Sequence, residues 1–141
     1  MRRLRRHSGN RPVLLGTVAF AVVLALAACG QAGAEPAIPQ GAGFSSWVQN
    51  GSGGRYVVPV VTGRAAALSA PQLGTVQTDS NCTPDVQGLS HCHNIIALAN
   101  GSQIEIVDNH QMSIHRCLRP GETVRVSPMH DRWVTVQVRR P

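Results

Sequence analysis

The pattern of apolar and polar positions divides the chain into three parts. An uncharged, mostly apolar run occupies residues 13–28, and the segment after it shows no apolar periodicity. Farther along, short β-branched or alternating segments recur between turn residues, a pattern typical of half-buried strands. The sequence therefore predicts a signal peptide at 1–28, a flexible linker at 29–54 and one folded domain at 55–141.

Six segments of the predicted domain carry strand signals. Apolar and polar residues alternate most clearly in the last two, so each is expected to bury one face. Pro59 interrupts the first segment and indicates an edge strand or a bulge there. The one helix-friendly patch, residues 65–68, is short. The six segments are 55–61, 73–78, 91–99, 102–107, 122–127 and 132–139.

These short strands, separated by tight turns, predict an all-β domain of five to seven strands in a partly closed barrel. Asn100-Gly101 indicates a two-residue type I′ hairpin turn, and Pro120-Gly121 suits the centre of a type II turn. The run from LANGSQIEIV through CLRPGETVRV is similar to strand pairs in OB-like or SH3-like barrels. That resemblance implies a fold and no particular function.

The N-terminal part carries an export signal. Five arginines precede the apolar run, which is too short to cross a bilayer at helical rise. Leu26-Ala27-Ala28-Cys29 resembles the lipobox of bacterial lipoproteins. The resemblance implies cleavage before Cys29, a diacylglycerol and a fatty acid such as palmitate on it, and anchoring on the extracytoplasmic face of the cell membrane. Ordinary cleavage after Ala34 is the alternative, and it would discard Cys29.

Composition changes this picture once the signal is removed. The whole chain has a formal net charge of +6, but eight arginines and seven acids follow residue 28, so the mature charge is about +1 and a nucleic-acid partner is not expected. A domain of this size has a marginal core that a disulfide would stabilise, and an oxidising compartment would permit one. The pairing among Cys82, Cys92 and Cys117 is left open.

The five histidines of the mature chain lie between residues 91 and 130. A two-residue turn at Asn100-Gly101 would place His91 opposite His110 and His93 opposite Asp108, on one face of the hairpin. Opposed Cβ atoms lie roughly 5 Å apart, so such imidazoles could hold a metal ion. The ion would be copper if a thioether joins and zinc if a carboxylate joins.

The candidate metal ligands are therefore His91, His93, His110, Asp108 and Met112. In the alternative interpretation these side chains form a solvated rim in which His93 pairs with Asp108 and no metal binds. Cys92 would face away from them, in a better position for a disulfide.

The segment from Ser113 to Arg119 looks like the Ser-His-Gly-Cys-Ile-Arg signature of L,D-transpeptidases, which implies a nucleophile at Cys117. Arg116 replaces the glycine of that signature, and the domain is shorter than that fold needs. The leading hypothesis is a non-enzymatic binding or structural module that acts on an envelope protein or ligand. A copper- or zinc-binding lipoprotein is the second hypothesis, and a transpeptidase-like enzyme is the third.

Overall fold

The computed structural model describes residues 35–63 and 68–140. The lipobox and most of the alanine-rich patch lie outside these residues. The described residues belong to one compact unit, Glu35–Pro141. The folded unit therefore begins upstream of the predicted boundary at residue 55.

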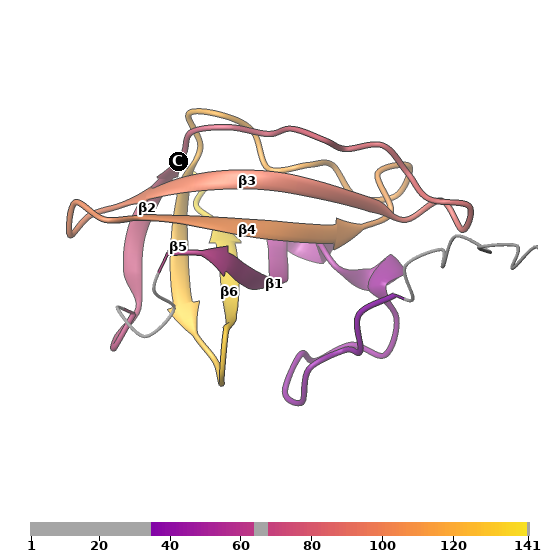
Figure 1. Cartoon of the computed structure of the whole chain (residues 1–141), viewed down its shortest axis with the longest axis horizontal. Coiled ribbons are helices and arrows are strands. Elements are labelled where there is room, and N and C mark those ends of the chain that lie inside the picture. The colour runs from indigo at the N-terminus through magenta and orange to yellow at the C-terminus, as the bar shows by residue number, and fades with distance from the viewer. Residues whose placement is uncertain (1–34, 64–67, 141) are drawn as a thin grey trace, which may run out of the picture. The chain divides into compact units, whose positions relative to one another are not determined.

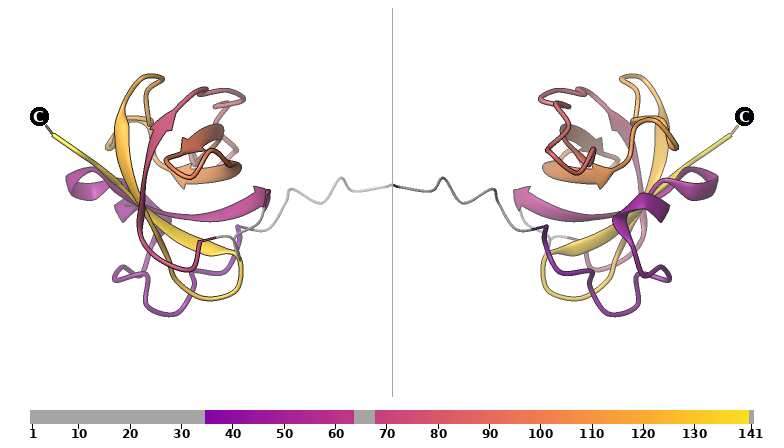
Figure 2. Two further views of the ribbon diagram at one scale, coloured as in Figure 1. Left: turned by 90° about the vertical axis from the view of Figure 1, so that its left-hand side faces the viewer. Right: turned by 90° about the vertical axis from the view of Figure 1, so that its right-hand side faces the viewer.

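Six antiparallel strands form a closed barrel in the order β1-β4-β3-β2-β5-β6 (Figure 1). The prediction of a small all-β barrel is confirmed, with full rather than partial closure. Figure 2 shows from two sides how the strands curve around a common interior. The strands are β1 (Arg55–Thr62), β2 (Gln72–Val76), β3 (Ser90–Leu98), β4 (Gln103–His110), β5 (Thr123–Pro128) and β6 (Trp133–Val138).

Alternate residues of the strands fill the interior, as the alternating patterns predicted. Gly74 allows β2 and β3 to lie close together, because a Cβ atom there would come within 2.7 Å of Ile96 Cγ2. The buried apolar core consists of Tyr56, Val58, Val60, Leu68, Val76, Ile96, Leu98, Ile104, Ile106, Leu118, Val124, Val126, Val134 and Val136.

Strand β1 lies between β6 and β4 in the closed barrel, but its two halves pair with different neighbours. Residues Arg55–Pro59 pair with β6, whereas pairing with β4 involves Val60 and Thr62, with a register shift between them. A bulge is present just after Pro59, between Val60 and Thr62, and Pro59 itself pairs with β6 but not with β4. The first half of β1 consequently lacks a ladder partner on the β4 side.

The N-terminal arm, residues 35–54, packs against the barrel instead of forming the predicted linker. It contains two short 3₁₀ helices, η1 (Trp47–Gln49) and η2 (Ser52–Gly54). Trp47 is 2% exposed and stacks on Trp133 with ring centroids 5.9 Å apart. Its Nε1 donates a hydrogen bond to Pro36 O at 2.8 Å. The arm has no apolar periodicity, but the large side chain of Trp47 is buried against the barrel and anchors the arm.

The hairpin between β3 and β4 has a three-residue turn, so the predicted two-residue turn is wrong. Gly101 N donates to Leu98 O at 2.9 Å, and Leu98 N donates to Ser102 O at 2.8 Å. Gly101 has a φ of 84°, whereas Asn100 keeps a negative φ. The Asn100 side chain accepts hydrogen bonds from Ser102 N and Oγ, which favours the longer turn.

Candidate functional site

The longer turn shifts the β3–β4 register by one residue. His91 pairs with Asn109, Cys92 with Asp108, and Ser90 with His110. Because successive side chains of a strand point to opposite faces, a one-residue shift exchanges the β3 side chains that share a face with a given β4 side chain. The predicted pairings of His91 with His110 and of His93 with Asp108 are therefore wrong.

The five predicted metal ligands do not come together. His91 and His93 lie on the outer face, where His91 contacts Asp85 at 3.2 Å and His93 contacts Glu105 at 2.8 Å. Asp108 and His110 are both fully buried inside the barrel. Met112 follows β4 and is 44% exposed. The outer histidines pair with carboxylates of their own surface, and because Asp108 and His110 are buried, the expected pairing of His93 with Asp108 in a solvated rim is wrong.

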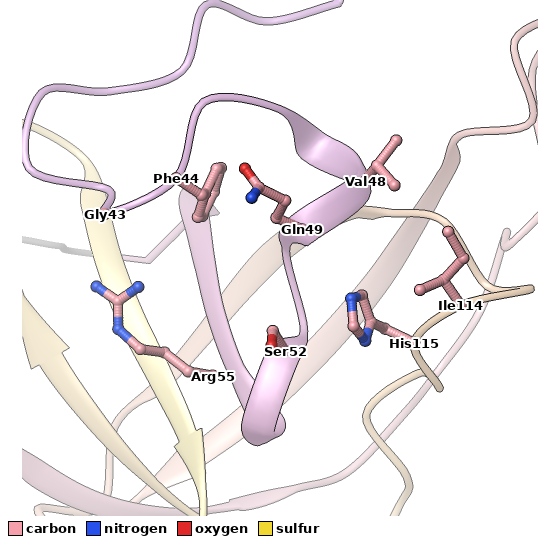
Figure 3. Close-up of a pocket in the computed structure, with 8 residues that line it drawn as sticks. All are labelled: Gly43, Phe44, Val48, Gln49, Ser52, Arg55, Ile114 and His115. Atoms are coloured by element: carbon pink, nitrogen blue, oxygen red, sulfur yellow. The ribbon is translucent and has the colours of Figure 1, made fainter.

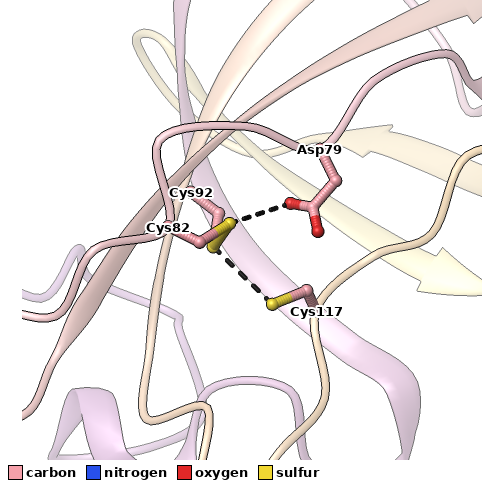
Figure 4. A group of neighbouring side chains, drawn as sticks. All are labelled: Asp79, Cys82, Cys92 and Cys117. Atoms are coloured by element: carbon pink, nitrogen blue, oxygen red, sulfur yellow. Dashed lines mark hydrogen bonds between the residues drawn. A yellow bond between two sulfur atoms is a disulfide. The ribbon is translucent and has the colours of Figure 1, made fainter.

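The structure instead brings the three cysteines together with Asp79, a residue that is not among the predicted ligands (Figure 4). Cys82 and Cys92 form the disulfide, with Cα atoms 4.2 Å apart. Cys92 Sγ lies 3.7 Å from the Sγ of Cys117, which is a free thiol. Asp79 Oδ1 lies 3.2 Å from Cys82 Sγ. The three-residue separation of Asp79 and Cys82 is the one sequence signal that could have indicated this cluster.

Backbone and side-chain contacts hold the loop between β2 and β3 beside the middle of β3, at His93 and Asn94. Ser80 and His93 exchange two backbone hydrogen bonds, of 3.0 and 2.8 Å. The buried side chain of Asn94 donates to Thr78 O and to Asp79 Oδ1, both at 3.0 Å. Asp79 and Cys82 are therefore placed over the fully buried Cys92.

A buried polar pair lies near this cluster. His110 Nδ1 is 3.2 Å from Asp108 Oδ2, close enough for an ion pair although the two atoms are not aligned for a hydrogen bond. Burial raises the pKa of Asp108. Burial also disfavours a charged His110 imidazole, but the adjacent Asp108 carboxylate outweighs it and raises the pKa of His110.

Cys117 has the properties of a poorly reactive thiol. Burial, together with the carboxylates of Asp79 and Asp108, raises its pKa to about 11. We therefore expect iodoacetamide to alkylate Cys117 at pH 7 roughly 300-fold more slowly than an ordinary thiol of pKa about 8.5, because the thiolate is the reactive form. The rate should rise about tenfold per pH unit up to pH 10.

Peptide mass spectrometry of time points would assign the alkylation to Cys117. The disulfide-bonded Cys82 provides an internal control, since it should stay unlabelled without reductant. Alkylation of Cys117 at neutral pH at the rate of an exposed thiol would contradict the expectation and favour the transpeptidase-like hypothesis.

A pocket of about 370 Å³ lies elsewhere, between the N-terminal arm and the loop after β4 (Figure 3). Apolar side chains line it together with two basic ones, Arg55 and His115. Arg55 Nη1 donates to Ala42 O at 2.7 Å, which ties this wall to the arm. Of the segment that resembles the transpeptidase signature, His115 borders this pocket, whereas Cys117 belongs to the cysteine cluster. The remaining lining residues are Gly43, Phe44, Val48, Gln49, Ser52 and Ile114.

Comparisons with protein-family models, with curated proteins and with solved structures found no match to this chain. Within residues 35–63 and 68–140, no helix is long and apolar enough to cross a membrane.

Proposed function

We propose that the protein is a lipid-anchored, extracytoplasmic binding module of a bacterial cell envelope, without enzymatic activity. The observation that carries this proposal is the lipobox-like Leu26-Ala27-Ala28-Cys29 directly after a short apolar run with a basic start. The Cys82–Cys92 disulfide supports it, because disulfides persist in oxidising compartments.

The early start of the compact unit limits how far the barrel can lie from the membrane. Only the residues between Cys29 and Glu35 separate an acylated Cys29 from that unit. Fully extended, such a short segment spans at most about 20 Å. The proposed module therefore works close to the membrane surface rather than at the end of a long tether.

The pocket beside the N-terminal arm is the candidate ligand surface of this module. Its volume falls in the range of small-molecule sites. Arg55 and His115 supply basic groups, while Phe44, Val48 and Ile114 supply apolar walls. Such a lining suits an envelope ligand or a peptide that carries both an acidic and an apolar group.

Lipid attachment is tested by metabolic labelling. Cells grown with a radioactive fatty acid should yield a labelled polypeptide that partitions into the membrane fraction. A Cys29→Ser variant should be unlabelled, because it lacks the sulfur that would carry the diacylglycerol. Cys117→Ser serves as the matched control and should keep the label. An unlabelled wild-type chain that fractionates like Cys29→Ser would contradict the proposal.

A metal site built from His91, His93 and His110 is not part of the proposed function. It required His91 and His110 on one face, and the observed register puts one outside and the other inside the barrel.

A further inference from the structure

We propose that Asp79, Cys82, Cys92 and Cys117 form a zinc site when the Cys82–Cys92 disulfide is reduced. This site goes beyond the envelope-binding function and does not depend on lipid attachment. One ligand atom from each residue lies within 4.8 Å of the others, and the side chains of Asp79 and Cys117 both point toward the Cys82–Cys92 disulfide (Figure 4).

The distances approach those of a tetrahedral zinc centre. With Zn–S bonds of about 2.3 Å, neighbouring sulfur atoms in such a centre lie roughly 3.8 Å apart. Cys92 Sγ and Cys117 Sγ are already 3.7 Å apart. Asp79 Oδ1 is 3.2 Å from Cys82 Sγ. The largest movement needed for zinc binding is therefore that of Cys82 Sγ away from Cys92 Sγ after the disulfide is reduced.

The scaffold holds the four donors in place. Cys92 is fully buried within β3, and the backbone bonds between Ser80 and His93 fix the loop that carries Asp79 and Cys82. The Asn94 amide donates to Asp79 Oδ1 at 3.0 Å, the kind of supporting contact that orients a carboxylate ligand. The Asp79-x-x-Cys82 spacing also matches the short ligand pairs of structural zinc sites.

The donor set favours zinc over the softer cuprous ion. Zinc accepts both thiolate and carboxylate donors in one tetrahedral shell. Copper(I) favours sulfur ligands and would leave the Asp79 carboxylate without a role. Three thiolates, one carboxylate and Zn²⁺ carry a net charge of −2, the same as a four-cysteine zinc centre.

The disulfide makes the site redox-dependent. A dithiol reductant transfers two electrons by thiol–disulfide exchange, so that its own sulfurs become a disulfide while Cys82 and Cys92 become thiols. Binding of Zn²⁺ then releases the protons of the three thiols, and each thiolate bonds to the ion. In the oxidised protein two of the four donors are bonded to each other, and the site is closed.

The full chain, reduced by a phosphine under anaerobic conditions, is titrated with Co²⁺ as a spectroscopic substitute for zinc. One equivalent should produce the intense absorption of tetrahedral cobalt–thiolate, and Zn²⁺ should abolish it. The unreduced chain should give no such band. We expect Cys117→Ser and Asp79→Asn to weaken binding at least tenfold, and the matched controls His91→Ala and Asp85→Asn to bind like wild type.

Two results would overturn the zinc site. One is the absence of a cobalt–thiolate band in reduced wild-type protein whose circular dichroism remains that of a β-barrel. The other is wild-type affinity in both Cys117→Ser and Asp79→Asn. Binding of copper(I) without a cobalt band would replace zinc by copper as the ion. Since Cys117→Ser keeps the Cys82–Cys92 disulfide, its oxidised form provides a check that this variant folds.

Discussion

Replacing Asn50 with alanine is expected to lower the free energy of unfolding by about 3–5 kcal/mol, because buried backbone groups left unpaired cost about 1–3 kcal/mol each. Asn50 is fully buried. Its Oδ1 accepts from Val57 N at 2.7 Å, and its Nδ2 donates to Val57 O at 3.2 Å and to Asn109 O at 2.8 Å.

These contacts join two strands where their own ladder is missing. Val57 precedes the part of β1 that pairs with β4, and Asn109 belongs to the end of β4. The side-chain amide of Asn50 thus takes the place of a neighbouring strand and closes the barrel at this seam. Alanine cannot supply either its donor or its acceptor.

Urea unfolding of the full chain, followed by circular dichroism, measures this effect. Gln49→Ala is the matched control: Gln49 is the exposed neighbour, and its loss should change the stability by less than about 0.5 kcal/mol. A loss below about 1 kcal/mol in Asn50→Ala would mean that other contacts hold the seam.

The stability of the fold should decrease as the pH rises above about 6.5, and Asp108→Asn should reduce this dependence. The pKa values of both Asp108 and His110 are raised in the folded protein. A raised pKa means that the folded state binds the proton more tightly than the unfolded chain. The stability that such a group contributes is fully present below its pKa in the unfolded chain. It is lost as the pH rises through its pKa in the folded protein.

The contribution of Asp108 is lost from above its unfolded pKa of 3.8, and that of His110 from above its unfolded pKa of 6.5, so both act in the same direction above pH 6.5. The upper limit of the loss is about 1.4 kcal/mol per pH unit for one proton. The buried carboxylate of Asp108 is then left beside a neutral imidazole, with Asp79 as a further negative charge that favours protonation of both groups. Asparagine at position 108 removes the buried charge, and with it the largest contribution that raises the pKa of His110.

Urea unfolding at pH 6.5, 7.5 and 8.5 provides the measurement. The difference between wild type and Asp108→Asn should shrink or reverse toward pH 8.5. Asp85→Asn is the control, since the pKa of Asp85 is lowered and its contribution changes only under acidic conditions. Parallel pH profiles for wild type and Asp108→Asn would refute the role of the pair.

Much of the fold could be predicted because its signals are local. Alternation over a few residues, as in β5 and β6, follows from the two-residue period of a strand with one buried face. The turn at Pro120-Gly121 was also predictable: Gly121 has a φ of 88°, and Glu122 N donates to Arg119 O at 3.1 Å. Each of these features depends on neighbouring residues alone.

The candidate site was predicted less well because it depends on the register between β3 and β4. Asn100-Gly101 is compatible with turns of two or three residues, and the Asn100 contacts to Ser102 favour three. With a turn one residue longer, His91 and His93 lie on the outer face of the hairpin, and Cys92 lies on the inner face beside Cys82 and Cys117. Periodicity does not indicate which of two adjacent registers will form.

The sequence by itself determined the all-β class, five to seven short strands and the lipobox-like leader that the proposed function depends on. Only the tertiary structure decided the closure of the barrel, the inclusion of the N-terminal arm, the Cys82–Cys92 pairing and the nearness of Asp79 to the cysteines. The physical reason is that strand periodicity is encoded within a few residues. Closure, disulfide choice and buried contacts such as that of Asn50 with Asn109 join residues far apart in the chain, which meet only when the whole barrel packs.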